Sequence, residues 1–388
     1  MAARSTRTTR RTWRGAALLG AGAVLLPLLT VAGPADAASP GATAAFTAKE
    51  RGRARPLVVG HRGASGYRPE HTLAAYELAV RMGADVIEPD LVPTKDGQLV
   101  ARHENEIGGT TDVADHPEFA NRRTTKTIDG VSVTGWFTED FTLAELRTLR
   151  VVERIPAVRQ RNTLYNGLFQ VPTLQEVIDL AKRLSREHRR TIAIIPETKH
   201  PTYFRKSAGL PLEPRVIEII KRNGLDRPDG RVILQSFEPT SARMLDKALR
   251  VQVTQLISAS GAPFDTIDNG HGPTYADMLT PQGLKEISTY ADWIGPEKTL
   301  IIPNRPDGTI GAPTTLVRDA HGAGLKLAPY TFRNENQFLP VDLRNGTVPS
   351  DYGQALREYE LFYRTGIDAV FSDNPDTAVL ARSLFADK

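Results

Sequence analysis

Short apolar runs alternate with segments of helical periodicity along most of the chain. Short runs of this kind predict buried strands, and apolar positions three and four apart predict amphipathic helices. The runs are Leu57–Gly60, Asp85–Leu91, Thr191–Pro196, Val232–Phe237, Val253–Ile257, Asp292–Gly295, Leu325–Phe332 and Asp368–Phe371. The helical segments are 72–82, 173–187, 213–223, 239–249, 274–289, 312–323, 351–365 and 375–385. Eight strand–helix units predict an α/β fold, a (β/α)8 TIM barrel, with a doubly wound open sheet as the alternative.

Capping residues support several of these helices. Thr72 and Thr173 are N-cap candidates, and Thr173 with Glu176 has the spacing of a capping box. Gly83 and Gly224 stand where a helix commonly ends, because glycine adopts the left-handed conformation at low cost. Local sequence therefore indicates where these helices begin or end.

The second unit departs from the strand–helix pattern. The stretch "LVARH" also has strand character, and "PTKDG" before it is too short for a helical crossover of about a dozen residues. Asp96-Gly97 is a hairpin turn signal, so 91–103 is predicted to form a hairpin that returns His103 to the end of the barrel where Asp90 lies. Residues 104–170 fit no unit and are interpreted as an insertion that caps this end.

The first 37 residues have the pattern of an export signal. Arg10-Arg11 precedes an apolar stretch, and "ADA" ends at Ala37 in the small-x-small pattern of a cleavage site. The paired arginines resemble the twin-arginine signal. A transmembrane anchor is the alternative, but about 16 apolar residues interrupted by glycine and proline fall short of the ~20 that span a bilayer.

We therefore expect three regions along the chain. Residues 1–37 would be a signal peptide recognised by the export machinery, 38–55 a flexible leader, and 56–388 a barrel domain. The mature protein would be secreted or periplasmic, with no stable insertion into the membrane.

Charge and cysteine content exclude some functions. The chain has 49 Lys and Arg against 45 Asp and Glu. Residues 1–37 hold five of the arginines and one of the acids, which leaves 44 of each sign from residue 38 onward. A neutral mature chain gives no support for nucleic-acid binding through bulk charge. The absence of cysteine excludes disulfides and thiolate metal sites.

Carboxylates stand at two neighbouring strand ends. Glu88 and Asp90 are two residues apart in "ADVIEPDLV", so on a strand both side chains point to one face. Buried together they repel each other unless a cation lies between them. Glu197 ends the next predicted strand in "IIPETKH", with Lys199 two residues further on. A salt bridge or helix cap is the commoner role for one Glu alone, but this trio predicts a single Ca²⁺ or Mg²⁺ ion rather than zinc.

Two of the eight histidines each follow an apolar strand, namely His61 and His103. Beside a metal ion and Arg62, we predict that they form a general acid–base pair. Arg62 and Lys199 add positive charge that suits a phosphoryl group. The other histidines are interpreted as supporting, packing or surface residues.

These motifs resemble the glycerophosphodiester phosphodiesterases, and among them the exported bacterial type. The matching stretches are "GHRGASGYRPEHT", "GADVIEPDLVPTKDGQLVARHE", "EIGGTTDVA", "IPETKH", "LQSF" and "FSDNPD". The resemblance implies the following roles: metal ligands Glu88, Asp90 and Glu197, acid–base residues His61 and His103, and phosphate contacts from His61, Arg62 and Lys199. It also implies one bound ion, usually Ca²⁺ in exported members. His71 stands where many relatives carry Asn.

The reaction implied by the resemblance is hydrolysis of a small-molecule glycerophosphodiester to sn-glycerol 3-phosphate and an alcohol. The substrate's own hydroxyl would attack phosphorus first, and water would then open the cyclic phosphate. The resemblance makes His61 the first base and His103 the first acid.

Two alternatives remain at this point. A related phosphodiesterase could act on phospholipid or teichoic acid, with aromatic residues of the insertion as an apolar rim or merely its core. A non-catalytic exported binding protein on a degenerate barrel is the second alternative, although every predicted site residue is present.

Overall fold

The computed structural model describes residues 55–386. The predicted signal peptide and, apart from Arg55, the predicted leader lie outside the described residues. The strands are β1 (Leu57–His61), β2 (Val86–Glu88), β3 (Asp90–Pro93), β4 (Leu99–Ala101), β5 (Thr124–Ile128), β6 (Val131–Gly135), β7 (Ala193–Ile194), β8 (Glu197–Thr198), β9 (Ile233–Ser236), β10 (Gln252–Ile257), β11 (Trp293–Pro296), β12 (Lys326–Leu327) and β13 (Ala369–Ser372). The α-helices are α1 (Leu73–Arg81), α2 (Leu143–Leu146), α3 (Leu174–Glu187), α4 (Pro201–Tyr203), α5 (Leu212–Arg222), α6 (Pro239–Ala248), α7 (Phe264–Asp268), α8 (Tyr275–Met278), α9 (Pro281–Ile287), α10 (Leu316–Gly322), α11 (Ala355–Thr365) and α12 (Pro375–Phe385).

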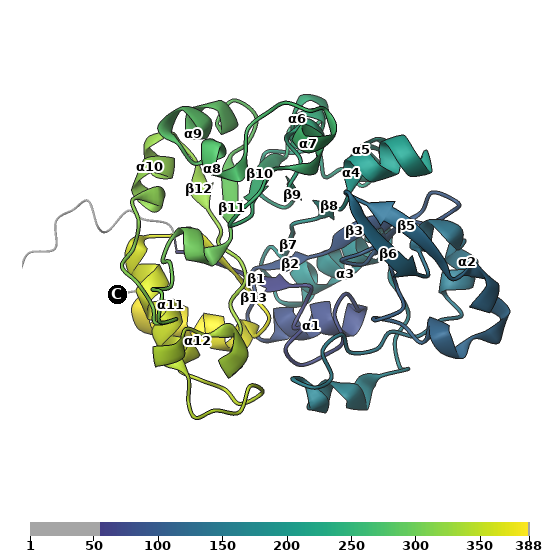
Figure 1. Cartoon of the computed structure of the whole chain (residues 1–388), viewed down its shortest axis with the longest axis horizontal. Coiled ribbons are helices and arrows are strands. Elements are labelled where there is room, and N and C mark those ends of the chain that lie inside the picture. The colour runs from purple at the N-terminus through teal and green to yellow at the C-terminus, as the bar shows by residue number, and fades with distance from the viewer. Residues whose placement is uncertain (1–54, 387–388) are drawn as a thin grey trace, which may run out of the picture. The chain divides into compact units, whose positions relative to one another are not determined.

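The parallel strands form a ring with helices outside it (Figure 1). Hydrogen-bonded neighbours run in the orders β13-β1-β2-β7 and β12-β11-β10-β9-β8-β3-β4. The two runs join because β2 and β3 are one strand interrupted at Pro89, and β7 continues into β8 after a similar break at Ile195 and Pro196. Proline has no N–H to give to a ladder, which accounts for both interruptions.

Backbone hydrogen bonds close the ring. They join β13 and the residue before it to the end of β12 and to the extended chain just after it. The Asp368 N–H donates to the Leu327 carbonyl at 3.0 Å, and the Phe371 N–H donates to the Pro329 carbonyl at 3.1 Å. β13 then pairs in parallel with β1. The predicted eight-unit barrel is confirmed, and the open doubly wound sheet is not the fold.

Successive side chains of a barrel strand point to opposite faces and pack in different hydrophobic clusters, as β1 illustrates. Val58 on β1 packs in the large cluster between strands and helices, while Val59 packs in a second cluster inside the ring. The inner cluster takes residues from seven points around the ring: Val59, Val86, Ala193 with Ile195, Ile233, Trp293, Ala328, and Ala369 with Phe371. A filled interior leaves the ends of the ring as the place for a site.

The predicted helix caps are confirmed. The Thr72 side chain accepts a hydrogen bond from the Ala75 N–H, and Thr173 with Glu176 forms a reciprocal capping box. Gly83 and Gly224 have φ of +100° and +68°, in the left-handed region.

Some predicted bounds were wrong. The helix expected over 274–289 is two helices, α8 and α9, because Pro281 opens α9 and Thr280 caps it. The helix expected over 351–365 begins only at Ala355, and the strand expected over 325–332 is the two-residue β12 followed by extended chain.

The predicted hairpin over 91–103 is confirmed. β3 and β4 pair antiparallel, from Leu91 opposite Ala101 to Pro93 opposite Leu99. The turn contains Gly97 at φ +71°.

The segment between β4 and α3 contains the β5–β6 hairpin, which the sequence analysis missed. Its turn is Asp129-Gly130, with φ of +47° and +82°. An Asp-Gly pair between two β-rich stretches is a hairpin signal that could have located it. Among residues 55–386, no helix has both the length and the apolarity needed to cross a membrane.

Candidate active site and metal centre

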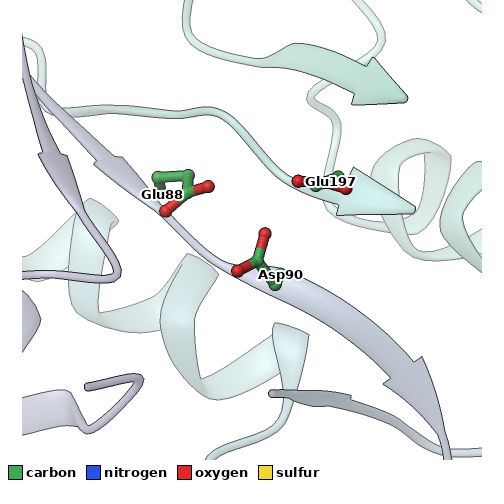
Figure 2. Close-up of side chains that lie close together, drawn as sticks. All are labelled: Glu88, Asp90 and Glu197. Atoms are coloured by element: carbon green, nitrogen blue, oxygen red, sulfur yellow. The ribbon is translucent and has the colours of Figure 1, made fainter. Parts of the chain in front are cut away.

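Three carboxylates converge at the ends of two neighbouring strand units. Glu88 ends β2, Asp90 begins β3, and Glu197 begins β8 directly opposite Asp90 in the parallel pairing. Each offers an oxygen within 4.8 Å of the others, and their exposed fractions are 2%, 0% and 5%. Figure 2 shows Glu88 and Asp90 on one continuous path of chain, with Glu197 on the strand beside them.

The carboxylate cluster fits a divalent ion. Its donors are oxygens only, which suits Ca²⁺ or Mg²⁺. Asp90 Oδ1 is buried without a hydrogen-bond partner among the described residues, whereas Asp90 Oδ2 accepts from His71 Nε2 at 2.9 Å. A buried carboxylate oxygen without a partner is costly unless a cation or water satisfies it.

The protonation of the cluster is strongly perturbed. Burial, with repulsion from Asp90, raises the pKa of Glu88 well above its usual value. Burial also raises the pKa of Glu197 to about 8, although Lys199 opposes the shift. Burial would raise the pKa of Asp90 as well, but the hydrogen bond from His71 and the charge of Lys199 hold it well below its usual range. Without an ion, the cluster therefore holds protons at neutral pH.

His61 and Arg62 stand where β1 ends. His61 lies opposite Glu88 in the pairing of β1 with β2, and its Nδ1 is 2.5 Å from Asp373 Oδ1. Arg62 has a left-handed φ of +57°, its N–H donates to Glu88 at 2.7 Å, and its guanidinium donates to Glu70 at 3.1 Å. Burial lowers the pKa of His61, although Asp373 opposes the shift.

His103 and Lys199 face each other across the site. Lys199 Nζ lies 3.3 Å from His103 Nε2 and 2.9 Å from Glu197 Oε1. His103 Nδ1 is bonded to Glu104, the next residue. Desolvation in the cavity, with the charges of Arg62 and Lys199, lowers the pKa of His103 to about 3. Both histidines are therefore neutral at pH 7 in the unliganded protein.

A cavity of about 390 Å³ opens between these groups. Five of the predicted residues line it: His61, Arg62, Glu88, His103 and Glu197. The aromatic residues Phe237, Tyr330, Phe338 and Phe371 also line it. The structure thus brings the predicted catalytic and phosphate-binding residues to one end of the barrel, with Asp90 and Lys199 in contact with that lining.

The aromatic residues of the insertion form mainly a core. Phe137 and Phe141 are fully buried, Trp136 and Tyr165 are half-buried, and Leu164 is exposed. Trp136 also donates its indole N–H to a backbone carbonyl. None of these side chains is among the residues that line the cavity.

Sequence analysis missed two partners of the predicted residues. Asp373 holds His61, and Glu104 holds His103. His71, interpreted from the sequence as a residue that supports the site, is fully buried between Tyr76 and Asp90. Asp373 lies in the quoted motif "FSDNPD", and that motif was the available signal.

A closed parallel barrel with charged groups gathered where its strands end defines a (β/α)8 enzyme. The family model described as "Glycerophosphoryl diester phosphodiesterase family" matches residues 61–377. The chain belongs to this family, and it is an enzyme of the phosphodiesterase class.

Curated relatives and solved structures agree with that membership. The glycerophosphodiester phosphodiesterase GDPD6 of Arabidopsis thaliana is 34% identical over 84% of this chain and 86% of its own length. A glycerophosphodiester phosphodiesterase of Haemophilus influenzae is 28% identical over 83% of this chain and 88% of its own. The solved structure of a phosphodiesterase of Oleispira antarctica in complex with the product sn-glycerol-3-phosphate is similar to this chain, with a TM-score of 0.54 at 20% identity over 84% of this chain and 97% of that one. That structural likeness supports the fold.

Proposed function

We propose that this protein hydrolyses glycerophosphodiesters to sn-glycerol 3-phosphate and an alcohol, using a divalent ion and two histidines. One observation carries the proposal. His61, Arg62 and His103 line the same cavity as Glu88 and Glu197. A carboxylate cluster, two neutral imidazoles and a guanidinium around one cavity suit a phosphodiester, whose charge must be bound and whose oxygens must exchange protons.

Glu88, Asp90 and Glu197 would hold the ion, and we propose Ca²⁺, with Mg²⁺ as the alternative. When bound, the ion would supply positive charge to the phosphate oxygens. Arg62 and Lys199 would add fixed positive charge on other sides of the same phosphate, since both side chains are buried and retain their protons.

His61 is assigned as the first base and His103 as the first acid. The neighbouring hydroxyl of the glycerol attacks phosphorus and loses its proton to His61, while the departing alcohol takes a proton from His103. Water then attacks the cyclic phosphate and loses a proton to His103, and His61 returns its proton to the glycerol oxygen. Both histidines end in their starting states. Holding the nucleophile within the substrate favours the first step.

The acid role requires a protonated His103, although its pKa in the unliganded protein is about 3. An anionic phosphodiester beside the ring favours the protonated form. Binding of the substrate is therefore proposed to raise the pKa of His103 toward the working pH.

A substrate panel tests the proposed function. The purified protein, loaded with Ca²⁺ or Mg²⁺, is offered glycerophosphocholine, glycerophosphoethanolamine, a lysophospholipid and teichoic acid. The products released from each are measured, with sn-glycerol 3-phosphate as the product of the two small diesters. We expect the two small diesters to be cleaved fastest. Faster cleavage of the lysophospholipid or teichoic acid would contradict the proposed substrate class, and no cleavage of any member would contradict the activity itself.

We also propose that the protein is exported and processed near Ala37. Arg10-Arg11 and the "ADA" site support this proposal.

A further inference from the structure

The bond between His103 and Glu104 is held by an arginine of the insertion. Glu104 Oε2 lies 2.6 Å from Arg154 Nη2. The Glu104 side chain is 36% exposed, so it would sample several rotamers without that ion pair. A carboxylate on His103 Nδ1 fixes the tautomer and leaves Nε2, which lies 3.3 Å from Lys199 Nζ, as the ring nitrogen that exchanges a proton with the substrate. That orientation lasts only while the carboxylate itself is held.

The same guanidinium also holds Arg62 through a second carboxylate. Arg154 Nε and Nη2 donate to the two oxygens of Glu70 at 2.8 and 2.6 Å. Glu70 in turn accepts from Arg62. Arg154 therefore lies between the carboxylate of an acid–base histidine and the carboxylate of a phosphate-binding arginine.

A parallel arrangement holds His61. Asp373 Oδ2 accepts from Arg159 Nη2 at 2.6 Å, while its Oδ1 contacts His61. Arg159 also donates to Ser65 O at 3.0 Å and to Glu335 at 2.7 Å. Arg333 approaches the same carboxylate at 2.7 Å, so Asp373 has two cationic partners where Glu104 has one.

The chain that carries both arginines is itself anchored to the barrel. Asn162 donates to Ser65 O at 3.1 Å and to Glu153 at 2.9 Å, and Glu153 accepts from the Ile155 N–H at 2.9 Å. Ser65 in turn donates its hydroxyl to His61 O at 2.8 Å. The insertion is thus joined to the histidine loop at this segment.

We propose that Arg154 and Arg159, both in the insertion, are positioning residues of the active site, each holding the carboxylate that orients one histidine. This inference rests on the proposed two-histidine function. It makes the insertion a working part of the site, beyond the cap that the sequence analysis expected.

Arg154→Ala provides the sharper test, because the two histidines have different tasks. Glycerophosphocholine has a poor leaving group and needs the acid, whereas a nitrophenyl ester of glycerol phosphate does not. With glycerophosphocholine, kcat should fall about tenfold to a hundredfold, the usual cost of losing an outer partner of a site residue. With the nitrophenyl ester, the rate of the first step, measured as nitrophenol released in a single turnover, should fall far less, because the base role of His103 belongs to the second step. KM should rise on both substrates, since Arg62 is loosened in either case.

Arg159→Lys should show no dependence on the leaving group. The base is needed whichever alcohol departs, so kcat should fall by a similar factor on both substrates. Lysine keeps the positive charge. Its single ammonium group cannot replace the planar guanidinium of Arg159, which donates to Asp373, Glu335 and Ser65 O at once.

Arg122→Ala is the matched control. Arg122 belongs to the same insertion, is 30% exposed against 28% for Arg154, and makes a two-pronged ion pair with Glu145. The substitution Arg122→Ala should leave kcat unchanged on both substrates. If Arg154→Ala does not fold, Glu104→Gln replaces it, because that side chain is partly exposed and keeps its shape.

Equal losses of the first-step rate on both substrates for Arg154→Ala, or activity equal to that of Arg122→Ala, would overturn the role of Arg154. Unchanged kcat for Arg159→Lys would overturn that of Arg159. His61→Ala and His103→Ala are measured alongside. Full activity in those two variants would instead show that the proposed function has failed. Adding Arg154→Ala to His103→Ala should lower kcat no further on glycerophosphocholine.

Discussion

The metal-free protein should become more stable when Glu88 is replaced by Gln. Glu88, Asp90 and Glu197 are buried, with carboxylate oxygens within 4.8 Å of one another. At that separation and an effective dielectric constant of about 20, two unit charges repel by about 3.5 kcal/mol. Glu88→Gln keeps the shape of the side chain and removes its charge.

The size of the gain follows from protonation. The pKa of Glu88 is raised well above its usual value by burial and by Asp90, so the folded protein keeps a proton on this group to a higher pH than the unfolded chain does. The unfolded chain releases that proton near pH 4.3, so at pH 7 the difference can destabilise the folded state by at most about 3.7 kcal/mol. Gln still accepts one of the hydrogen bonds that Arg62 N and Gln235 donate to Glu88. Allowing about 1 kcal/mol for the other, we expect a net gain of up to about 2.7 kcal/mol.

Urea unfolding measures this gain. Wild type and Glu88→Gln are compared at pH 7 in chelator and again with saturating Ca²⁺. In chelator the variant should be the more stable protein. With Ca²⁺ at about 1,000 times its Kd the order should reverse, since the ion then adds about 4.1 kcal/mol to a protein that binds it, more than the gain expected for the variant. Glu218→Gln, at an exposed position on α5, should change neither measurement.

The pH dependence supplies an independent check. Folded metal-free wild type keeps a proton on Glu88 that the unfolded chain releases, so the stability of wild type relative to Glu88→Gln should rise as the pH falls from 7 toward 5, by up to about 1.4 kcal/mol per pH unit. The buried histidines titrate alike in both proteins, so their contribution cancels in this difference. A metal-free variant less stable than wild type at pH 7, with the same slope, would refute the argument that these carboxylates repel one another.

Four further predictions can be tested directly. Chelation should abolish turnover and lower the melting temperature, and Asp90→Ala should reproduce both effects in enzyme and melting assays; full activity after chelation would contradict the metal site. His61→Ala and His103→Ala should each reduce kcat by about 10²–10⁴ while circular dichroism shows a folded protein, and the double variant should lose less than the product of the two factors. Burial opposes ionisation of Glu70, but Arg62 and Arg154 hold its pKa well below its usual value. Wild type should therefore be more stable than Glu70→Gln above about pH 5, and this difference should shrink as the pH falls through the pKa of Glu70 in the folded protein. Urea unfolding at a series of pH values measures it. Mass spectrometry of the culture medium should find a chain that begins near Ala38, and a membrane-bound form that retains residues 1–37 would count against export.

Local pattern in the sequence was enough to predict most of the barrel. Strand periodicity placed Glu88 and Asp90 on one face, and the structure keeps them there even though Pro89 interrupts the ladder between them. The Asp96-Gly97 turn correctly predicted a hairpin that returns His103 to the site. These features depend on residues only a few positions apart, so dihedral preferences and side-chain alternation suffice to determine them.

Local signals were also present where the prediction failed. Asp129-Gly130 marks the β5–β6 hairpin, and Thr280-Pro281 marks the break between α8 and α9. Both lie in polar or mixed stretches where apolar periodicity is weak. The turn and cap residues were therefore more informative there than the hydrophobic pattern.

Only the tertiary structure decided which charged groups hold the histidines. Asp373 lies 312 positions from His61, and Arg154 lies 84 positions from Glu70. No periodicity relates such residues, because their distance depends on closure of the ring and on how the insertion folds back over it. An isolated Arg or Asp in a loop has no preferred partner in its local sequence. Its partner is determined when the ends of the parallel strands gather at one face of the barrel and the surrounding core excludes water from the charges.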